Sequence, residues 1–155
     1  MMKGYQIADE PAPSTFARYA VNPLYPMLAM MFAGVWFAWP WFAFNSFAVG
    51  SPTRRAELGW LVAGLFVPAG VGMALLLARE AGLLPRFSTP YVGLIVILLK
   101  LVAVYAVYLL QSRTIEIYEY YGGMLVNGVW PLLAALYLGD RLLADLPVLL
   151  FLALS

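Results

Sequence analysis

The chain has 155 residues, enough for one domain, and 64% of them are hydrophobic while 11% are charged. A water-soluble fold of this size cannot hide so much apolar surface, because small domains bury a smaller share of their surface than large ones. The formal net charge of +1 provides no basic field for nucleic acid, so we expect the lipid bilayer as a partner and no nucleic acid.

Residues 1–22 are polar and are predicted to form an N-terminal tail, outside a transmembrane bundle built by residues 23–155. Pro11 and Pro13 exclude a long helix in the tail. Charges such as Lys3 and Asp9 stand where a signal peptide would have its apolar region, so no signal peptide is predicted.

A first membrane span is predicted over residues 26–49, which are rich in aromatic side chains. Tryptophan normally marks the membrane interface, yet Trp36 and Trp39 lie near the middle of this segment. Pro40 lacks a backbone donor and predicts a kink there. The aromatic side chains could line a ligand site, but packing and lipid contact are the favoured interpretation.

A turn follows at Gly50, Ser51 and Pro52, and the two arginines after it, Arg54 and Arg55, are expected at the membrane edge. Their guanidinium groups can reach phosphate headgroups from that position. Simple anchoring is the favoured role, with lipid-specific binding as the alternative.

Small residues lie along one side of the predicted second span, residues 59–78. At about 100° per residue, four of them fall within one sector roughly 60° wide. They are Gly59, Ala63, Gly70 and Ala74. Small residues allow membrane helices to approach closely, so this sector is predicted to be a helix-packing stripe.

The third span is predicted over residues 91–110, with Lys100 at its midpoint. An unpaired cation there costs about 2.5–3.5 kcal/mol. No helix breaker occurs before Gly122, so this helix could extend to residue 121. In that case five residues fall on one line facing the bundle interior: Gly93, Lys100, Val107, Gln111 and Tyr118.

The fourth span is predicted over residues 124–143, followed by an apolar C-terminal tail. Gly139, Asp140 and Arg141 interrupt this stretch. Either one helix leaves the membrane near Arg141, or two half-helices meet at Gly139. We detect no internal repeat in the chain.

A charge pair between Lys100 and Asp145 is the one candidate site that the sequence predicts. If the third and fourth helices pair antiparallel about Gly122 and Gly123, both residues lie at the same depth. Opposite charges lower each other's desolvation cost. Asp140 and Arg141 are candidate contributors to this pair.

The chain has no histidine and no cysteine, so the commonest general base and the commonest metal ligands are missing. Its serines have no histidine to activate them. We therefore predict no catalytic residues, no metal site, no cofactor and no enzymatic activity.

The predicted fold is an all-α integral membrane protein, a four-helix transmembrane bundle in up-down order. With the N-terminus inside, five basic residues are cytoplasmic (Lys3, Arg18, Arg79, Arg86 and Arg141) and three are outside (Arg54, Arg55 and Arg113). The positive-inside rule then favours both termini in the cytoplasm of a bacterial-type inner membrane.

Two functions are compatible with these features. The favoured one is a non-catalytic subunit or interaction partner of a membrane assembly, bound to other subunits or to itself, because small-residue stripes suit contacts between helices. The alternative is an oligomeric transporter, channel or lipid-handling protein that uses the intramembrane Lys100.

Overall fold

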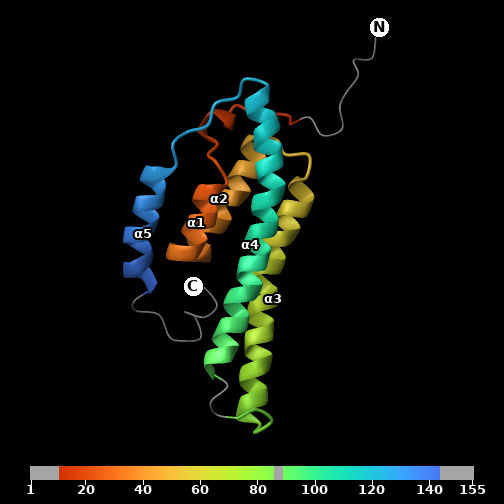
Figure 1. The fold of residues 1–155 in the computed structure, drawn as a ribbon, viewed down its shortest axis with the longest axis vertical. Helices are drawn as coiled ribbons and strands as arrows, with labels where there is room; N and C mark the ends of the chain where they lie inside the picture. The colour runs from red at the N-terminus through yellow and green to blue at the C-terminus, as the bar shows by residue number, and fades with distance from the viewer. Residues whose placement is uncertain (1–10, 86–88, 144–155) are drawn as a thin grey trace.

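The computed structural model describes residues 11–85 and 89–143, the side chains of Thr89 and of residues 140–143 excepted. This part of the chain is all-helical, as predicted (Figure 1). A short 3-10 turn, η1 (Ala17–Tyr19), precedes five helices: α1 (Leu24–Ala33), α2 (Val35–Ala48), α3 (Arg54–Glu80), α4 (Thr89–Tyr120) and α5 (Val129–Leu143). Their arrangement differs from an up-down bundle of four spans.

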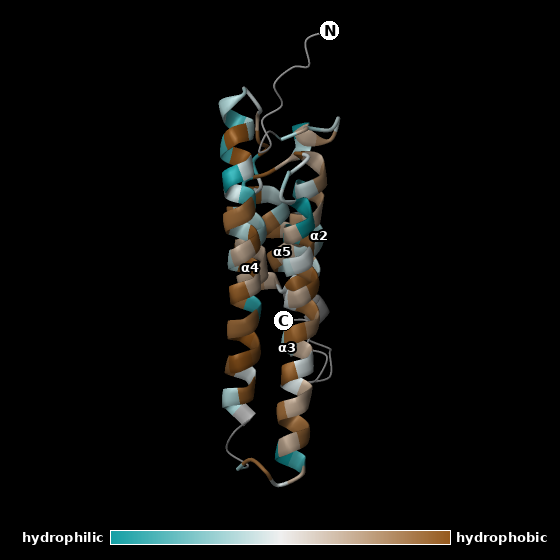
Figure 2. Ribbon diagram, turned by 90° about the vertical axis from the view of Figure 1, so that its right-hand side faces the viewer, coloured by the Kyte–Doolittle hydropathy of each residue, from teal (hydrophilic) through white to brown (hydrophobic). Residues whose placement is uncertain are grey.

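Helices α3 and α4 form a long antiparallel pair (Figure 1). They contain 27 and 32 residues and are long and apolar enough to cross a membrane. Figure 2 shows that brown, hydrophobic residues occupy most of the length of both helices. The prediction that the third helix continues beyond residue 110 is confirmed, because α4 ends at Tyr120, just before Gly122 in the left-handed conformation.

Glycines on one face of α3 permit its close approach to α4. A Cβ atom on Gly64 would lie 2.7 Å from the Cβ of Ala103, and one on Gly72 would lie 2.9 Å from Cγ2 of Val96. Gly64 also receives the edge of the Trp39 ring from α2. These contacts explain why α3 carries glycine at its buried positions.

The predicted packing stripe lies on the opposite, outer face of α3. Ala63 is half-buried, whereas Gly59, Gly70 and Ala74 are exposed, and a Cβ on Gly59 or Gly70 would meet nothing within 4 Å. Contacts within the described part of the chain therefore use Gly64 and Gly72. The stripe remains a prediction for contacts with another molecule.

Residues 26–49 form a helical hairpin, so the prediction of a single span there is wrong. Gly34, with φ 85°, interrupts the helix and separates α1 from α2. The backbone N–H of Val21 donates to Oδ1 of Asn45, and Nδ2 of Asn45 donates to the Val21 carbonyl. The chain therefore descends through α1 and returns through α2 to its starting level.

Neither limb of the hairpin is long enough to cross a bilayer. With 10 and 14 residues, the limbs extend about 15 and 21 Å, against about 30 Å for the hydrocarbon core. Hydropathy gives the length of an apolar segment but not the position of a chain reversal. Here the reversal occurs at Gly34, because glycine readily adopts the left-handed conformation. Pro40, where a kink was predicted, lies inside α2.

Helix α5 packs beside α1 and runs parallel to it (Figure 1). Gly128 lies against Tyr25 at one end, and Gly139 lies against Ala33 at the other. Because α5 continues through Gly139, the alternative of two half-helices meeting there is wrong. Helix α5 begins at Val129, later than the predicted residue 124.

This packing exposes a short repeat that the sequence analysis missed. Residues 20–34 and 125–139 share the pattern Val-Asn-x-x-aromatic-Pro and end in glycine. Asn22 Oδ1 accepts the Leu24 N–H at 2.9 Å, and Asn127 Oδ1 accepts the Val129 N–H at 3.0 Å. The two copies lie side by side and are joined by a parallel bridge between Val21 and Val126.

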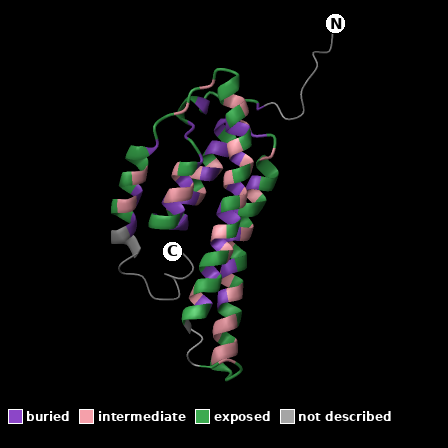
Figure 3. Ribbon diagram, in the orientation of Figure 1, coloured by how far each residue is buried: buried purple, intermediate pink, exposed green. Residues whose placement is uncertain are grey.

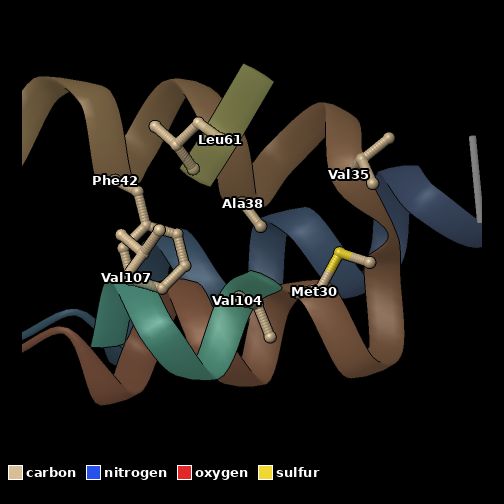
Figure 4. Packing of buried hydrophobic residues seen from close by; sticks show 7 residues of the cluster. All are labelled: Met30, Val35, Ala38, Phe42, Leu61, Val104 and Val107. Atoms are coloured by element: carbon tan, nitrogen blue, oxygen red, sulfur yellow. The ribbon is translucent and has the colours of Figure 1, made fainter. Parts of the chain in front are cut away.

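A hydrophobic core joins the hairpin to α3 and α4 (Figure 4). It consists of Met30, Val35, Ala38, Phe42, Leu61, Val104 and Val107. Figure 3 shows that buried residues concentrate where the hairpin covers the long pair, while beyond it α3 and α4 are buried mainly where they face each other. The hairpin therefore fixes one end of the molecule.

Adding a methyl group to each of two glycines of α3 tests this packing. We expect Gly64→Ala to lower the thermal unfolding midpoint in mild detergent by about 3–6 °C, since overpacking costs about 1–3 kcal/mol. Gly59→Ala is the matched control, because the same Cβ meets nothing there and alanine favours helix. Equal midpoints for the two variants would contradict the close approach at Gly64.

Candidate functional site

A buried polar cluster lies where α2, α3 and α4 meet, at the end of the long pair that the hairpin covers. At its centre is Glu57, whose exposed fraction is 0%. Glu57 lies in the first turn of α3, where the helix dipole favours a negative charge. The cluster was not predicted, because a glutamate near a helix start is also typical of an ordinary solvated helix end.

Four side-chain donors surround the Glu57 carboxylate. Oε1 accepts hydrogen bonds from the Ser51 hydroxyl and, at 2.7 Å, from the Thr53 hydroxyl. Oε2 accepts from the Ser46 hydroxyl and, at 3.0 Å, from Nε2 of Gln111. A buried carboxylate requires such partners, because its transfer from water is otherwise very costly.

Gln111 links α4 to the other two helices. Its Nε2 lies 2.7 Å from the Phe42 carbonyl oxygen and 2.8 Å from the Ser46 Oγ, both in α2. One side chain therefore connects α4 with α2 and, through Glu57, with α3. The Thr114 hydroxyl adds a contact of 3.3 Å to Ser51, one turn further along α4.

The sequence did identify the face of α4 that carries this residue. Lys100, Val107 and Gln111 were predicted on an inward line, and their exposed fractions are 1%, 0% and 2%. Gly93 and Tyr118, at the ends of the same line, are half-buried. Helical spacing thus located Gln111, but only the fold shows that it meets Glu57.

The hydrogen bonds of the cluster connect three helices of the same chain. Both carboxylate oxygens of Glu57 already accept two hydrogen bonds each, from side chains of the same chain. Within residues 11–85 and 89–143 there is no group of three or more metal-ligand side chains. The arrangement holds three helices in register around one charge.

Lys100 is the second buried charge and lies deeper along α4. It shares a line of that helix with Val104, which belongs to the same buried cluster as Met30 and Val35, the members on either side of the hairpin turn. Lys100 is therefore close in depth to Gly34 at the tip of the hairpin. Helix α1 ends there at Ala33, and the carbonyl end of a helix favours a cation.

The predicted partner of Lys100 is not placed by the structure. Asp145 lies outside the described residues, and so do the side chains of Asp140 and Arg141. Helix α5 runs antiparallel to α4, as that prediction assumed, but it packs beside α1 and not against α4 (Figure 1). The Lys100–Asp145 contact itself stays a prediction.

Comparison of the chain with protein-family models, with curated proteins and with solved structures returns no match.

Two serine substitutions of identical chemistry test the role of the cluster. Ser46→Ala removes a donor to the buried Glu57 and should lower the free energy of unfolding by about 1–3 kcal/mol. The control is Ser112→Ala, because the buried Ser112 hydroxyl has no hydrogen-bond partner among the described residues. Denaturant titration in detergent should show the control at or above wild-type stability, and equal losses would contradict the assignment.

Proposed function

We propose that this chain is an integral membrane protein that acts as a non-catalytic subunit or interaction partner of a membrane assembly. Its contact surface is the outer face of α3. The proposal has three parts, namely the membrane setting, the orientation and the contact itself.

The low burial of the long apolar helices supports the membrane setting. In their most hydrophobic windows, only 22% of α3 and 33% of α4 is buried within the chain. The core helix of a soluble protein would be mostly buried, whereas lipid can cover these surfaces. Gly34 and its neighbours Ala33 and Val35 are themselves buried, as non-helical backbone at membrane depth has to be.

The hairpin changes the predicted orientation of the basic residues. If α3 and α4 cross the bilayer and the hairpin enters without crossing, Arg18, Arg54, Arg55 and Arg113 share the N-terminal side. Arg79 lies at the opposite end of α3. The positive-inside rule then favours a cytoplasmic N-terminus, in a bacterial-type inner membrane; the position of residues 144–155 lies outside the described part.

The outer face of α3 carries the proposal. Its small residues Gly59, Gly70 and Ala74 are exposed. The close contacts of α3 within the chain use two other glycines, Gly64 and Gly72. A second small-residue face on the same helix is suited to a helix from another subunit or another copy, because association in lipid depends on close backbone contact.

Photocrosslinking in the native membrane tests the contact. A photoreactive residue at position 70 should give a discrete protein adduct, which mass spectrometry can identify. The same residue at position 102, an exposed position on α4, serves as the control. Introducing Gly59→Ile should abolish the adduct at position 70, and lipid adducts alone at both positions would refute the proposal.

Cysteine labelling tests the orientation, and the chain's lack of native cysteine makes each label specific. Thr15→Cys and Leu83→Cys introduce thiols at exposed positions beside the hairpin and in the α3–α4 loop. In sealed vesicles with the outer face exposed, an impermeant maleimide should label position 83 and leave position 15 unlabelled until detergent is added. The reverse pattern would contradict the orientation.

A second candidate function is favoured by the position of Lys100. The half-length helix α1 ends near the depth of this buried cation, and transporters place discontinuous helices around midplane sites. An oligomeric transporter, channel or lipid-handling protein would give a cysteine at position 100 access to water. A subunit without a transport path would leave that cysteine unreactive toward a membrane-impermeant thiol reagent.

A further inference from the structure

An apolar groove of about 330 Å³ runs between α2 and α3. Its walls include Trp36, Trp39 and Pro40 from α2 and Leu58, Val62 and Leu65 from α3. Trp36 and Val62 are exposed by 61% and 56%, so the groove opens to the outside of the molecule. A narrow apolar ligand could enter it from the surrounding lipid.

Two arginines stand at one end of the groove. Arg54 begins α3, and helical spacing places it on the same side as Leu58 and Leu65. Its guanidinium carbon lies 4.9 Å from the centre of the Phe47 ring in α2. Arg55 lies on the same side as Val62, seven residues later.

We propose that this groove binds one acyl chain of an anionic glycerophospholipid, with the lipid phosphate at Arg54 and Arg55. Arginine binds phosphate oxygens through paired N–H donors. The apolar walls of the groove pack against the acyl chain. This inference rests on the membrane setting of the proposed function, but not on a contact at the outer face of α3.

The distance from the arginines to the far end of the groove agrees with this ligand. From Arg54 to Leu65 the axis of α3 rises about 16 Å, roughly half the hydrocarbon thickness of a bilayer. A phospholipid with its phosphate at the arginines would therefore place its acyl chain from the headgroup level to the middle of the membrane.

The arginines distinguish this occupant from a helix of a second copy. An apolar helix could fill the groove, but it would bring no negative charge to the level of Arg54 and Arg55. Basic residues attract an anionic headgroup electrostatically. The charge at the groove entrance therefore favours an anionic headgroup.

Native mass spectrometry of the detergent-purified chain tests the proposal. The probes are phosphatidylglycerol and phosphatidylcholine with identical acyl chains, titrated separately. Wild type should bind phosphatidylglycerol about tenfold more tightly. The double variant Arg54→Gln with Arg55→Gln should lose this preference, while Val62→Trp should weaken binding of both lipids.

Two matched variants act as controls. Arg79→Gln removes an arginine from the opposite end of α3, and Val102→Trp adds the same bulk at an exposed position of α4; both should bind as wild type does. A thermal unfolding midpoint within a few degrees of wild type shows that each variant is folded. Equal affinity for the two lipids, or equal effects of test and control variants, would overturn the lipid site.

A dimer that Val62→Trp disrupts would also overturn the lipid site and would assign the groove to a second copy.

Alkaline carbonate extraction tests the membrane setting separately from the lipid site. A chain released by carbonate refutes the membrane setting and with it the proposed function. A chain that stays in the membrane but shows no lipid preference refutes the groove assignment alone.

Discussion

The buried carboxylate of Glu57 is the constraint on which the described structure depends. Its two oxygens accept hydrogen bonds from Ser46, Ser51, Thr53 and Gln111, which come from α2, the loop before α3, and α4. Because a buried charge is tolerated only with such partners, the three helices have little freedom to slide past one another. The register fixed here also determines the depth of the hairpin tip and the course of the α2–α3 groove.

Helix α3 has to satisfy two kinds of packing at once. On its inner face, Gly64 and Gly72 pack against α4. The polar cluster around Glu57 lies on the same face, at the N-terminal end of α3. Its outer face keeps Gly59, Gly70 and Ala74 exposed. The sequence alone showed one stripe, because helical spacing groups small residues by side but does not say which side meets the rest of the chain.

Several features could be predicted from the sequence, for physical reasons. Composition required helices with long apolar faces, and the absence of a breaker before Gly122 predicted the length of α4. The prediction that Lys100, Val107 and Gln111 lie on one inward side of α4 was correct, because helical spacing shows which residues of one helix share a side. The hairpin was missed because an apolar stretch of suitable length does not reveal a reversal, and Gly34 resembles other glycines in apolar segments.

The polar cluster was missed for a different reason. Ser46, Ser51 and Glu57 are close in sequence, but Gln111 lies 54 residues after Glu57, and each residue is of an ordinary type for its position. The end of α2 and the start of α3 are adjacent in the chain, and only the fold places the second half of α4 beside both. The repeat around Asn22 and Asn127 did carry a sequence signal, since both copies place asparagine before a helix and proline four residues later.

Glu57 and Lys100, the buried charges among the residues that the structure describes, follow one electrostatic rule at two depths. Glu57 lies in the first turn of α3, where the partial charge of the helix end is positive. Lys100 lies near the depth of the C-terminus of α1, where that partial charge is negative. A hairpin that reverses inside the apolar region is what brings such a helix end to the level of Lys100. One span across the same residues would place both of its ends at the membrane surfaces, far from this cation. The reversal at Gly34 therefore agrees with the position of the buried lysine, as the start of α3 agrees with that of Glu57.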